Sequence, residues 1–489
     1  MKIIQLLLLF SNFVFYVEAN ATTRYVKNVS AGNGSGTSWT NASADLQSIL
    51  NASGTGDEVW VAEGTYFPTD SMGEPNPADA RTKTFNLKNG VKLYGGFSST
   101  GSPVFTERKC GTYQTILSGD IGSVDDSTDN CYHVISMLYG DSNTLIDGFV
   151  IEKGNAKFSN LSSAGGAYNS KDCGGAVYLF ATQNSVTFAN CVFTHNSAFA
   201  GGAIVADQSN PTFFNCIFAD NNSTWFGIMT GILGIDGKYD GACILSVNFS
   251  LPTFTNCTFC SNFSNGDKYA VLASDGSQFY IQNCIFYKNS SLGVPVDNLY
   301  FGSTFNSLLT GPIDTNITPV PEGNIINADP VFVNNIDFKG IDGKWMTADD
   351  GLSLQSTSPC INKGDSSYVL FGYNTDIIGA NRVFGVNTDI GAYELQAMLS
   401  SSDPENHKVS LFIYPNPATN FINLQLKGYE GVLEKIELID FLGRLIEVNP
   451  IPSISKHLFT IQTANLSRGA YLLSINAEYT NVVKLFFLE

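Results

Sequence analysis

Charged residues are scarce in this 489-residue chain, making up 14% of it, and histidine occurs only four times. Acidic residues outnumber basic ones by 44 to 26, which gives a formal net charge of −18. A nucleic acid would have to approach against this negative field, so we expect no nucleic-acid partner. Scarce charge together with 12% aromatic residues argues against a disordered chain and favours a folded core.

Long apolar runs are also missing, except near the N-terminus. Lys2 is followed by an apolar stretch from Ile3 to Val17 and then by the small-residue site Ala19-Asn20-Ala21. This order predicts a secretory signal peptide over residues 1–21. The alternative is a membrane anchor, which needs about 20 apolar residues. No cysteine precedes Cys110, so no lipid-bearing cysteine would follow the cleavage site.

The ten cysteines do not form an evident disulfide framework. Four of them recur inside a repeat, which favours a role as small buried apolar groups over disulfides between repeats. Cys110 and Cys131, which flank a polar insertion, make the one plausible bridge. Cys257-x-x-Cys260 resembles a metal or redox pair, but Cys257 occupies the repeat position and a core role is preferred.

The repeat itself determines the predicted fold. The pattern Asn-Cys-x-Phe-x-x-Asn begins at Asn190, Asn215, Asn256 and Asn283, so successive copies are 25, 41 and 27 residues apart. Short stretches rich in Phe, Val, Ile and Thr lie between the copies and are too short for helices. A unit of this length cannot bury its own apolar face and must stack on its neighbours. We therefore expect an all-β chain built around a parallel β-helix.

Stacking places equivalent residues directly above one another, about 4.8 Å apart. The sequence therefore predicts an internal aromatic stack of Phe193, Phe218, Phe259 and Phe286. It also predicts an amide ladder at a corner of the coil, where Asn tolerates left-handed backbone; its members would be Asn190, Asn215, Asn256 and Asn283.

The β-helix is expected to occupy residues 22–396, with an N-terminal cap at about 22–56. In this cap Leu46, Ile49 and Leu50 have helical spacing and follow candidate N-caps at Thr40, Asn41 and Ser43. The stretch from Asp389 to Glu394 would close the domain, and residues 397–410 read as a linker.

From residue 411 to 489 the pattern changes to alternating strands separated by turns, which predicts a small antiparallel Ig-like β-sandwich. Three short boxes lie in order within it: Tyr414-Pro415-Asn416-Pro417-Ala418, Ile439-Asp440-Phe441-Leu442-Gly443-Arg444, and Leu466-Ser467-Arg468-Gly469-Ala470-Tyr471-Leu472-Leu473, with Lys484 near the end. In these boxes the segment resembles the type A sorting domain of the type IX secretion system. The alternative is an Ig-like module that binds some other ligand.

This resemblance implies that the chain is exported across a bacterial outer membrane by the type IX secretion machinery. It further implies that the domain is then removed and that the passenger is attached to surface lipopolysaccharide or released. The residues carried over as the sorting signal are Pro415, Asn416, Pro417, Asp440, Gly443, Gly469, Tyr471 and Lys484.

Residues 22–396 resemble pectin-lyase-like parallel β-helix proteins, and in particular polymorphic outer-membrane-protein repeats. The elements that carry the likeness include Gly201-Gly202-Ala203-Ile204 and Phe218-Ala219-Asp220-Asn221. The resemblance implies a right-handed coil. It leaves the function open, because this scaffold hosts lyases, glycosidases, adhesins and inert spacers alike.

Residues suited to catalysis are hard to find. The β-helix region has only four arginines, none of them in the repeats beside an acidic cluster, and no Gly-His-Gly element. His195 occupies a repeat position held elsewhere by Asp220, Ser261 and Lys288, which indicates an outward turn. Asp342, Asp349 and Asp350 could supply oxygen ligands to Ca²⁺, although a plain acidic turn is the alternative.

We therefore expect a secreted or cell-surface protein, associated with the outer membrane, that is non-catalytic and adhesin-like or glycan-binding. Its ligand would be a polysaccharide or a host or cell-surface molecule. The alternative is a polysaccharide lyase or glycosidase that uses an unfamiliar set of residues, and a third interpretation is an inert spacer. No cofactor is required, with Ca²⁺ as the one candidate.

Overall fold

A computed structural model divides the chain into two compact units, Met1–Met398 and Leu399–Glu489. It describes residues 21–71, 76–141, 143–157, 170–183, 186–224, 241–265, 271–275, 277–291, 294–295, 302–309, 323–370, 372–396, 410–414, 417–427, 433–440, 444–446, 451–452, 458–477 and 480–488. The predicted signal peptide (all but residue 21) and linker (all but residue 410) lie outside the described residues. No helix among those residues is long and apolar enough to cross a membrane.

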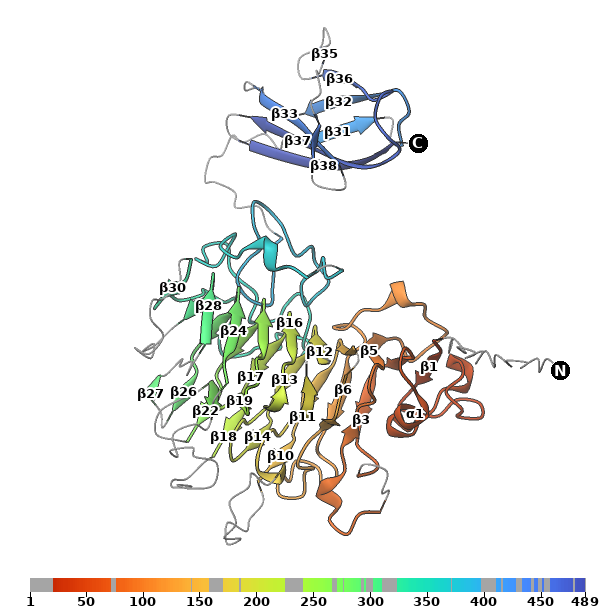
Figure 1. Ribbon diagram of the computed structural model, residues 1–489, viewed down its shortest axis with the longest axis vertical. Helices are drawn as coiled ribbons and strands as arrows, with labels where there is room; N and C mark the ends of the chain where they lie inside the picture. Colours follow the sequence, from red (N-terminus) through yellow and green to blue (C-terminus); the bar gives the residue numbers. More distant parts are fainter. Residues whose placement is uncertain are drawn as a thin grey trace, which may run out of the picture. The chain divides into compact units, whose positions relative to one another are not determined.

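The first unit is a coil in which each turn adds one strand to each of several parallel sheets (Figure 1). Sheet A contains β1 (Thr23–Val26), β2 (Glu58–Ala62), β5 (Lys92–Phe97), β8 (Thr144–Asp147), β12 (Val186–Ala189), β16 (Thr212–Phe214), β20 (Thr253–Thr255), β24 (Phe279–Gln282) and β28 (Gly302–Phe305). Sheet B contains β3 (Gly64–Tyr66), β6 (Thr115–Ser118), β9 (Val150–Glu152), β13 (Val192–Thr194), β17 (Ile217–Ala219), β21 (Thr258–Cys260), β25 (Ile285–Tyr287), β29 (Leu308–Leu309) and β30 (Ile325–Ile326).

Two shorter sheets complete the coil. Sheet C contains β4 (Phe85–Asn86), β7 (Ile135–Leu138), β11 (Val177–Gln183), β15 (Ile204–Ser209), β19 (Ile244–Val247) and β23 (Leu272–Asp275). Sheet D contains β10 (Asn155–Ala156), β14 (Ser197–Ala198), β18 (Asn222–Ser223), β22 (Phe263–Ser264), β26 (Ser290–Ser291) and the antiparallel β27 (Val294–Pro295). Short 3₁₀ helices interrupt the connections: η1 (Trp39–Asn41), η2 (Ala80–Thr82), η3 (Phe105–Glu107), η4 (Ser170–Asp172) and η5 (Ser366–Tyr368).

One short helix, α1 (Leu46–Ala52), lies at the N-terminal end of the coil. Its apolar residues Leu46, Ile49 and Leu50 join the interior core, as their spacing predicts. The predicted N-caps are wrong, because Asp45 caps the helix by accepting a hydrogen bond from the Ser48 backbone N–H at 3.1 Å. The helix therefore covers the end of the core beside the first strands.

The predicted phenylalanine stack fills the interior of the coil. Phe193, Phe218, Phe259 and Phe286 are in register on neighbouring strands of sheet B, and their ring centroids lie 4.7, 4.7 and 4.5 Å apart. A second stack from sheet A interlocks with it edge to face and contains Phe188, Phe213 and Phe254. Parallel stacking within each column and edge contacts between columns fill the space between the two sheets.

The predicted amide ladder at the corner after sheet A is wrong beyond its first step. Asn190, Asn215, Asn256 and Asn283 do adopt left-handed backbone, with φ between 49° and 53°. Asn215 Nδ2 donates to Asn190 Oδ1 at 3.1 Å, but the Asn283 side chain instead pairs with the backbone of Asp365. The side-chain amide of Asn256 is buried and has no hydrogen-bond partner among the described residues. The corner side chains are thus shared with another segment of the chain.

The continuous ladder is made by the second asparagine of the repeat. In each step the side chain nitrogen of one residue donates to the side chain oxygen of the next, at 2.9 to 3.1 Å. The same oxygens also accept the backbone N–H of the preceding rung. The members are Asn196, Asn221, Asn262 and Asn289, all fully buried.

Residues 328–396, here called the strap, lie along the outer face of sheet B. Their apolar side chains, including Phe332, Trp345 and Tyr393, form a second core with outward residues of that sheet. Gln114 Nε2 donates to the Trp345 backbone oxygen at 3.2 Å, 231 residues away in sequence. The strap therefore spans from the last coils to one of the first and covers this face of the β-helix.

The second unit consists of two antiparallel sheets. Sheet E contains β31 (Ser410–Tyr414), β32 (Phe421–Lys427), β36 (Leu458–Gln462) and β35 (Ile451–Pro452). Sheet F contains β34 (Leu445–Ile446), β33 (Leu433–Asp440), β37 (Gly469–Ala477) and β38 (Thr480–Leu488). Alternate residues such as Ile422, Leu438 and Leu473 form a common apolar core, as expected for a small sandwich.

Candidate functional site

The acidic loop proposed for calcium is held by its own hydrogen bonds. Asp349 Oδ2 accepts the backbone N–H groups of Ile341 and Asp342 at 2.7 and 3.2 Å, while Asp342 Oδ1 accepts that of Lys344. The hydroxyl of Thr347 also donates to Asp349. This bond, together with the two backbone bonds to Asp349, holds the pKa of Asp349 below its usual range. Within the described residues, no group of three or more His, Cys, Asp or Glu side chains could hold a metal ion.

Asp350 faces inward, unlike Asp342 and Asp349, which are exposed. Its side chain is fully buried and accepts hydrogen bonds from the Met346 backbone, the Thr347 hydroxyl and the Tyr393 hydroxyl. Burial raises the pKa of Asp350 to about 6, and the hydrogen bonds counteract only part of that effect. Asp350 therefore ties the loop that contains Met346 and Thr347 to the C-terminal end of the strap.

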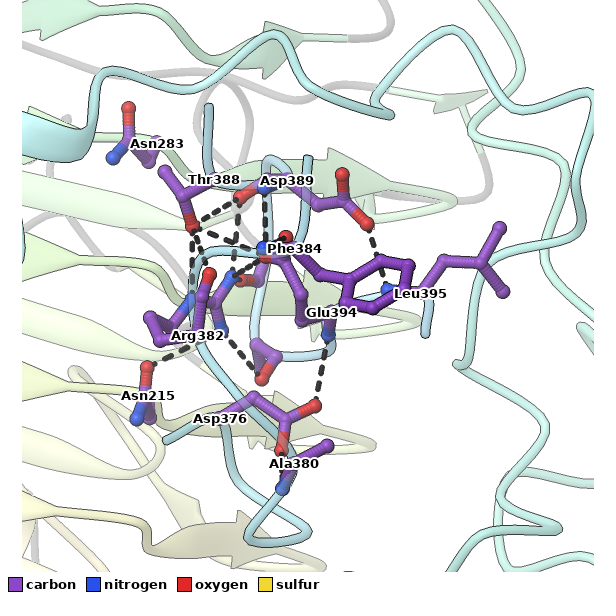
Figure 2. Close-up of polar contacts among 12 residues, drawn as sticks. Asn215, Asn283, Asp376, Ala380, Arg382, Phe384, Thr388, Asp389, Glu394 and Leu395 are labelled. Atoms are coloured by element: carbon purple, nitrogen blue, oxygen red, sulfur yellow. Dashed lines mark hydrogen bonds and ion pairs between the residues drawn. The ribbon is translucent and has the colours of Figure 1, made fainter. Parts of the chain in front are cut away.

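A dense polar cluster surrounds Arg382 in the strap (Figure 2). The guanidinium is fully buried and donates to the backbone oxygens of Asp389, Gly391 and Ala392 at 2.8 to 3.1 Å. It also reaches Asn215 Oδ1 of the coil at 3.4 Å and lies 3.5 Å from Glu394 Oε2. Arg382 thus joins the closing turn of the strap to the corner of sheet A.

Three carboxylates surround this arginine, and each has structural partners. Asp376 accepts hydrogen bonds from the backbone N–H groups of Ile378, Ala380 and Glu394. Asp389 accepts hydrogen bonds from those of Asn362 and Leu395. Glu394 accepts hydrogen bonds from those of Phe384 and Asp389. Burial raises the pKa of all three, that of Glu394 to about 7. Since every carboxylate already binds backbone, the cluster fastens the strap and offers no open position for a substrate.

A second charged pair lies at the same corner, nearer the N-terminus. Arg108 Nη2 donates to Asp147 Oδ1 at 2.8 Å, and Asn190 Nδ2 donates to the same oxygen at 2.9 Å. Burial opposes the charge, but the Asp147 carboxylate outweighs it and raises the pKa of Arg108 above its normal value. Arg108 consequently remains a cation and cannot accept the proton that an elimination reaction must remove.

The histidines of the coil serve turns and packing. His195 has φ of 54° and an exposed side chain, and the equivalent residues Asp220, Ser261 and Lys288 have φ of 55° to 56°. The structure thus places all four at the outward turn that the sequence indicates. His133 Nδ1 lies 2.8 Å from the Gly174 backbone oxygen.

The Cys110–Cys131 bridge that the sequence made plausible is not formed, because both residues are free thiols. Cys131 is part of the interior core, whereas Cys110 packs against the separate core beneath the strap. Cys257 and Cys260 are likewise divided between these two cores, so their sulfur atoms cannot meet at one metal. Burial raises the pKa of Cys110 to about 11, which makes it a poor nucleophile.

The outer face of sheet A is only half covered. One column of its outward side chains lies beneath other segments, with Tyr94 against Phe105 and Phe214 against Tyr373. The neighbouring column is partly exposed, and its residues face one another strand by strand. It contains Lys92, Leu145, Thr187, Thr212, Thr253 and Tyr280, and we call it the open strip.

Polar and apolar groups alternate along one margin of the open strip. This margin is formed by the residues that lie two positions before a strip residue, namely Asn210, Leu251 and Gln278. Leu251 donates its backbone N–H to Asn210 Oδ1. At the adjoining turn Phe249 is 85% exposed and adopts φ of 64°, a backbone conformation that bulky side chains rarely take. Phe249 therefore adds an exposed aromatic surface beside this margin of the strip.

The sorting-motif residues in the second unit make local structural bonds. Asp440 accepts hydrogen bonds from the Arg444 backbone and side chain, and Tyr471 donates its hydroxyl to the Ser467 backbone oxygen at 2.6 Å. Gly469 begins β37 with φ of 148°, which favours glycine. Pro417 and Lys484 are exposed, and Pro415, Asn416 and Gly443 lie outside the described residues.

Two parts of the molecule escaped the sequence analysis. The buried asparagine ladder was assigned to the wrong asparagine of each repeat, although both positions recur with the same spacing. Arg382 and its carboxylates gave a weaker signal: a lone arginine followed by the Asp389–Glu394 stretch. A charged side chain that is buried must find buried partners, and the carboxylates near Arg382 in the sequence are Asp376, Asp389 and Glu394.

Two family matches accompany this geometry. Residues 412–489 match the family described as "Secretion system C-terminal sorting domain", and residues 109–315 match that described as "Right handed beta helix region". Among curated proteins no sequence relative was found. A solved structure titled "Crystal structure of pectate lyase Pel9A" aligns with 76% of this chain and 96% of its own, at 13% identity and a TM-score of 0.30.

Proposed function

We propose that this chain, a right-handed parallel β-helix that ends in a type IX secretion sorting domain, is a non-catalytic surface protein that binds polysaccharide along the open strip. The sorting domain itself implies export and an interaction with the type IX secretion machinery. Retention at the outer membrane, through lipopolysaccharide after removal of the domain, is part of the proposal.

The observation that carries the proposal is the threonine column of the strip. Thr187, Thr212 and Thr253 are in register and half-exposed, and Tyr280 continues the column with 39% of its surface exposed. Their hydroxyls recur at the spacing of the coils, about 4.8 Å. Repeated hydroxyls beside aromatic and apolar surface suit a chain of sugar rings, which offer hydroxyl groups at their edges and C–H groups on their faces.

The composition of the strip argues for binding over cleavage. Glycoside hydrolysis requires a pair of carboxylates flanking the scissile bond, and the open strip contains none. Lys92, at one end of the strip, is in register with Glu58 of β2, a single carboxylate that accepts a hydrogen bond from the Trp60 indole N–H at 3.0 Å. The buried carboxylates of the strap are committed to backbone groups, and Arg108 is committed to Asp147.

The test is binding of the purified full chain to a panel of neutral and acidic polysaccharides by affinity electrophoresis. A substitution in the strip, Thr212→Lys, places a long charged side chain across the column, whereas Ser197→Lys places the same side chain on sheet D of a neighbouring coil. We expect retardation that Thr212→Lys abolishes and Ser197→Lys preserves.

Parallel incubations distinguish the enzymatic alternative. Unsaturated products detected by ultraviolet absorbance would identify a lyase, and new reducing ends would identify a hydrolase. Either result, or retardation that both variants preserve, would overturn the proposal.

A further inference from the structure

The outer face of sheet F carries apolar side chains that adjoin one another on neighbouring strands. On sheet E the outward residues are mixed: Asn423 and Thr460 are paired across the strands by a 2.9 Å hydrogen bond between their side chains, whereas Phe421 is an aromatic residue with 43% exposure. On sheet F the outward residues Leu445, Ile439 and Leu472 face one another across β34, β33 and β37. The inward residues of the same strands, such as Leu438 and Leu473, already form the core.

The apolar side chains on sheet F are well exposed. Leu445 is 61% exposed, Leu472 is 41% exposed, and Phe487 on the neighbouring β38 is 46% exposed. Phe487 pairs with Ala470, which lies two residues before Leu472 on β37, so it extends the same face. We call Leu445, Ile439, Leu472 and Phe487 the sheet F stripe. A contiguous apolar face of this kind on a small domain marks an interaction site.

Two arginines lie at one end of the stripe. Arg444 directly precedes Leu445 and has 72% of its side chain exposed, and Arg468 directly precedes Gly469 at the start of β37. Because Asp440 pairs with Tyr471, the end of β33 and the beginning of β37 meet at the same end of the sheet. Asp440 binds Arg444, whereas Arg468 forms no ion pair among the described residues.

We propose that the sheet F stripe is the surface by which the sorting domain binds a protein component of the secretion machinery. The partner would present an apolar patch with carboxylates placed to meet the arginine end. The sorting assignment supplies the partner, because a sorting domain must be recognised by the machinery. The apolar side chains in register on three neighbouring strands select sheet F, and the arginines select an acidic rim. This inference does not depend on polysaccharide binding by the β-helix.

The chain offers a matched pair of variants for the test. Phe487→Ser removes an aromatic side chain from the stripe, and Phe421→Ser removes one of similar exposure, 43%, from the outer face of sheet E. Each full-length variant is produced in a bacterium with type IX secretion, and exported and retained protein are quantified. We expect Phe487→Ser to lower the ratio of exported to retained protein at least about tenfold, as loss of an interface anchor does, and Phe421→Ser to leave it unchanged.

The charge component has its own variants. Arg468→Glu should reduce export to a similar degree, and Arg468→Lys should restore most of it. Thermal unfolding of each purified variant separates a binding defect from loss of the fold. If a stripe variant melts early, Leu472→Ser provides the same reading at a second stripe position.

Several outcomes would contradict the inference. Equal export of the two phenylalanine variants would show that the stripe is not recognised. Flotation of the purified chain with outer-membrane lipid vesicles, lost in Phe487→Ser, would assign the stripe to a lipid surface. A dimer in solution that Phe487→Ser dissociates would assign it to a second copy of the chain.

Discussion

The side chain of Asn215 in the coil donates a hydrogen bond to the backbone oxygen of Thr375 in the strap, 160 residues away, at 2.8 Å. Its oxygen accepts one from Arg382. Asn215 occupies the corner position of its repeat, and it therefore also makes a long-range contact. The corner asparagines consequently differ in energetic importance from the ladder asparagines, although both recur with the same spacing.

Asn221→Ala should be much more destabilising than Asn256→Ala. Removal of the Asn221 amide leaves several buried ladder partners unsatisfied, which costs at least about 3 kcal/mol at 1–3 kcal/mol for each group. The Asn256 amide has no partner to lose, so its replacement costs about 1 kcal/mol for alanine in left-handed backbone. Denaturant unfolding of both variants checks the order, and equal losses would contradict the ladder assignment.

The β-helix should lose stability as pH rises from about 5 to about 8. Burial raises the pKa of Asp350 to about 6 and of Glu394 to about 7, from ordinary values of 3.8 and 4.5. The folded state therefore retains protons that the unfolded chain has released in this window. The loss attributable to Glu394 is on the order of 3 kcal/mol. Melting temperatures measured across the range should show this fall, and Glu394→Gln should flatten it.

Calcium should have little effect on stability. The carboxylate oxygens of Asp349 and Asp350 already accept hydrogen bonds from the chain, so a cation would have to displace them. We expect the melting temperature to be the same in excess Ca²⁺ and in EDTA. A rise of several degrees with Ca²⁺, lost in Asp349→Asn, would instead support a calcium site in this loop.

Reducing agents should not change the stability of the protein, because all ten cysteines are free thiols. Burial raises the pKa of Cys110 and, to a greater extent, that of Cys131, so neither forms a reactive thiolate near neutral pH. Titration with a thiol reagent should detect few groups in the native protein and ten after denaturation. A native Cys110–Cys131 bridge would lower the second number by two.

The sequence was sufficient for the architecture because the repeat records what each rung shares with the next. Register and spacing placed Phe193 over Phe218, and the boxes around Asp440 and Tyr471 identified the tail. The strap could not be anticipated in the same way. Its contacts to Thr112 and Gln114 join residues more than 230 positions apart, and no periodicity encodes such a pairing.

Prediction of the asparagine ladder and of the open strip from the sequence was limited by a similar ambiguity. Each repeat contains two asparagines that recur with the same spacing. The direction of the side chain, which points inward for Asn221 and toward the strap for Asn215, shows which of them forms the ladder. The open strip likewise depends on which column the strap and the Phe105 segment leave uncovered. That is a property of tertiary packing, and alternation along a strand cannot reveal it.

The strap alters how the coil can come apart. A bare stack of coils resembles a linear chain of nearest-neighbour links and can fray from either end. Here Thr258 in the middle of the stack holds Ala392, Asn283 holds Asp365, and Gln114 near the beginning holds Trp345. A late coil therefore cannot peel away until these distant links release together. The solenoid should melt in one cooperative transition. A protease should therefore not digest it progressively from an exposed end.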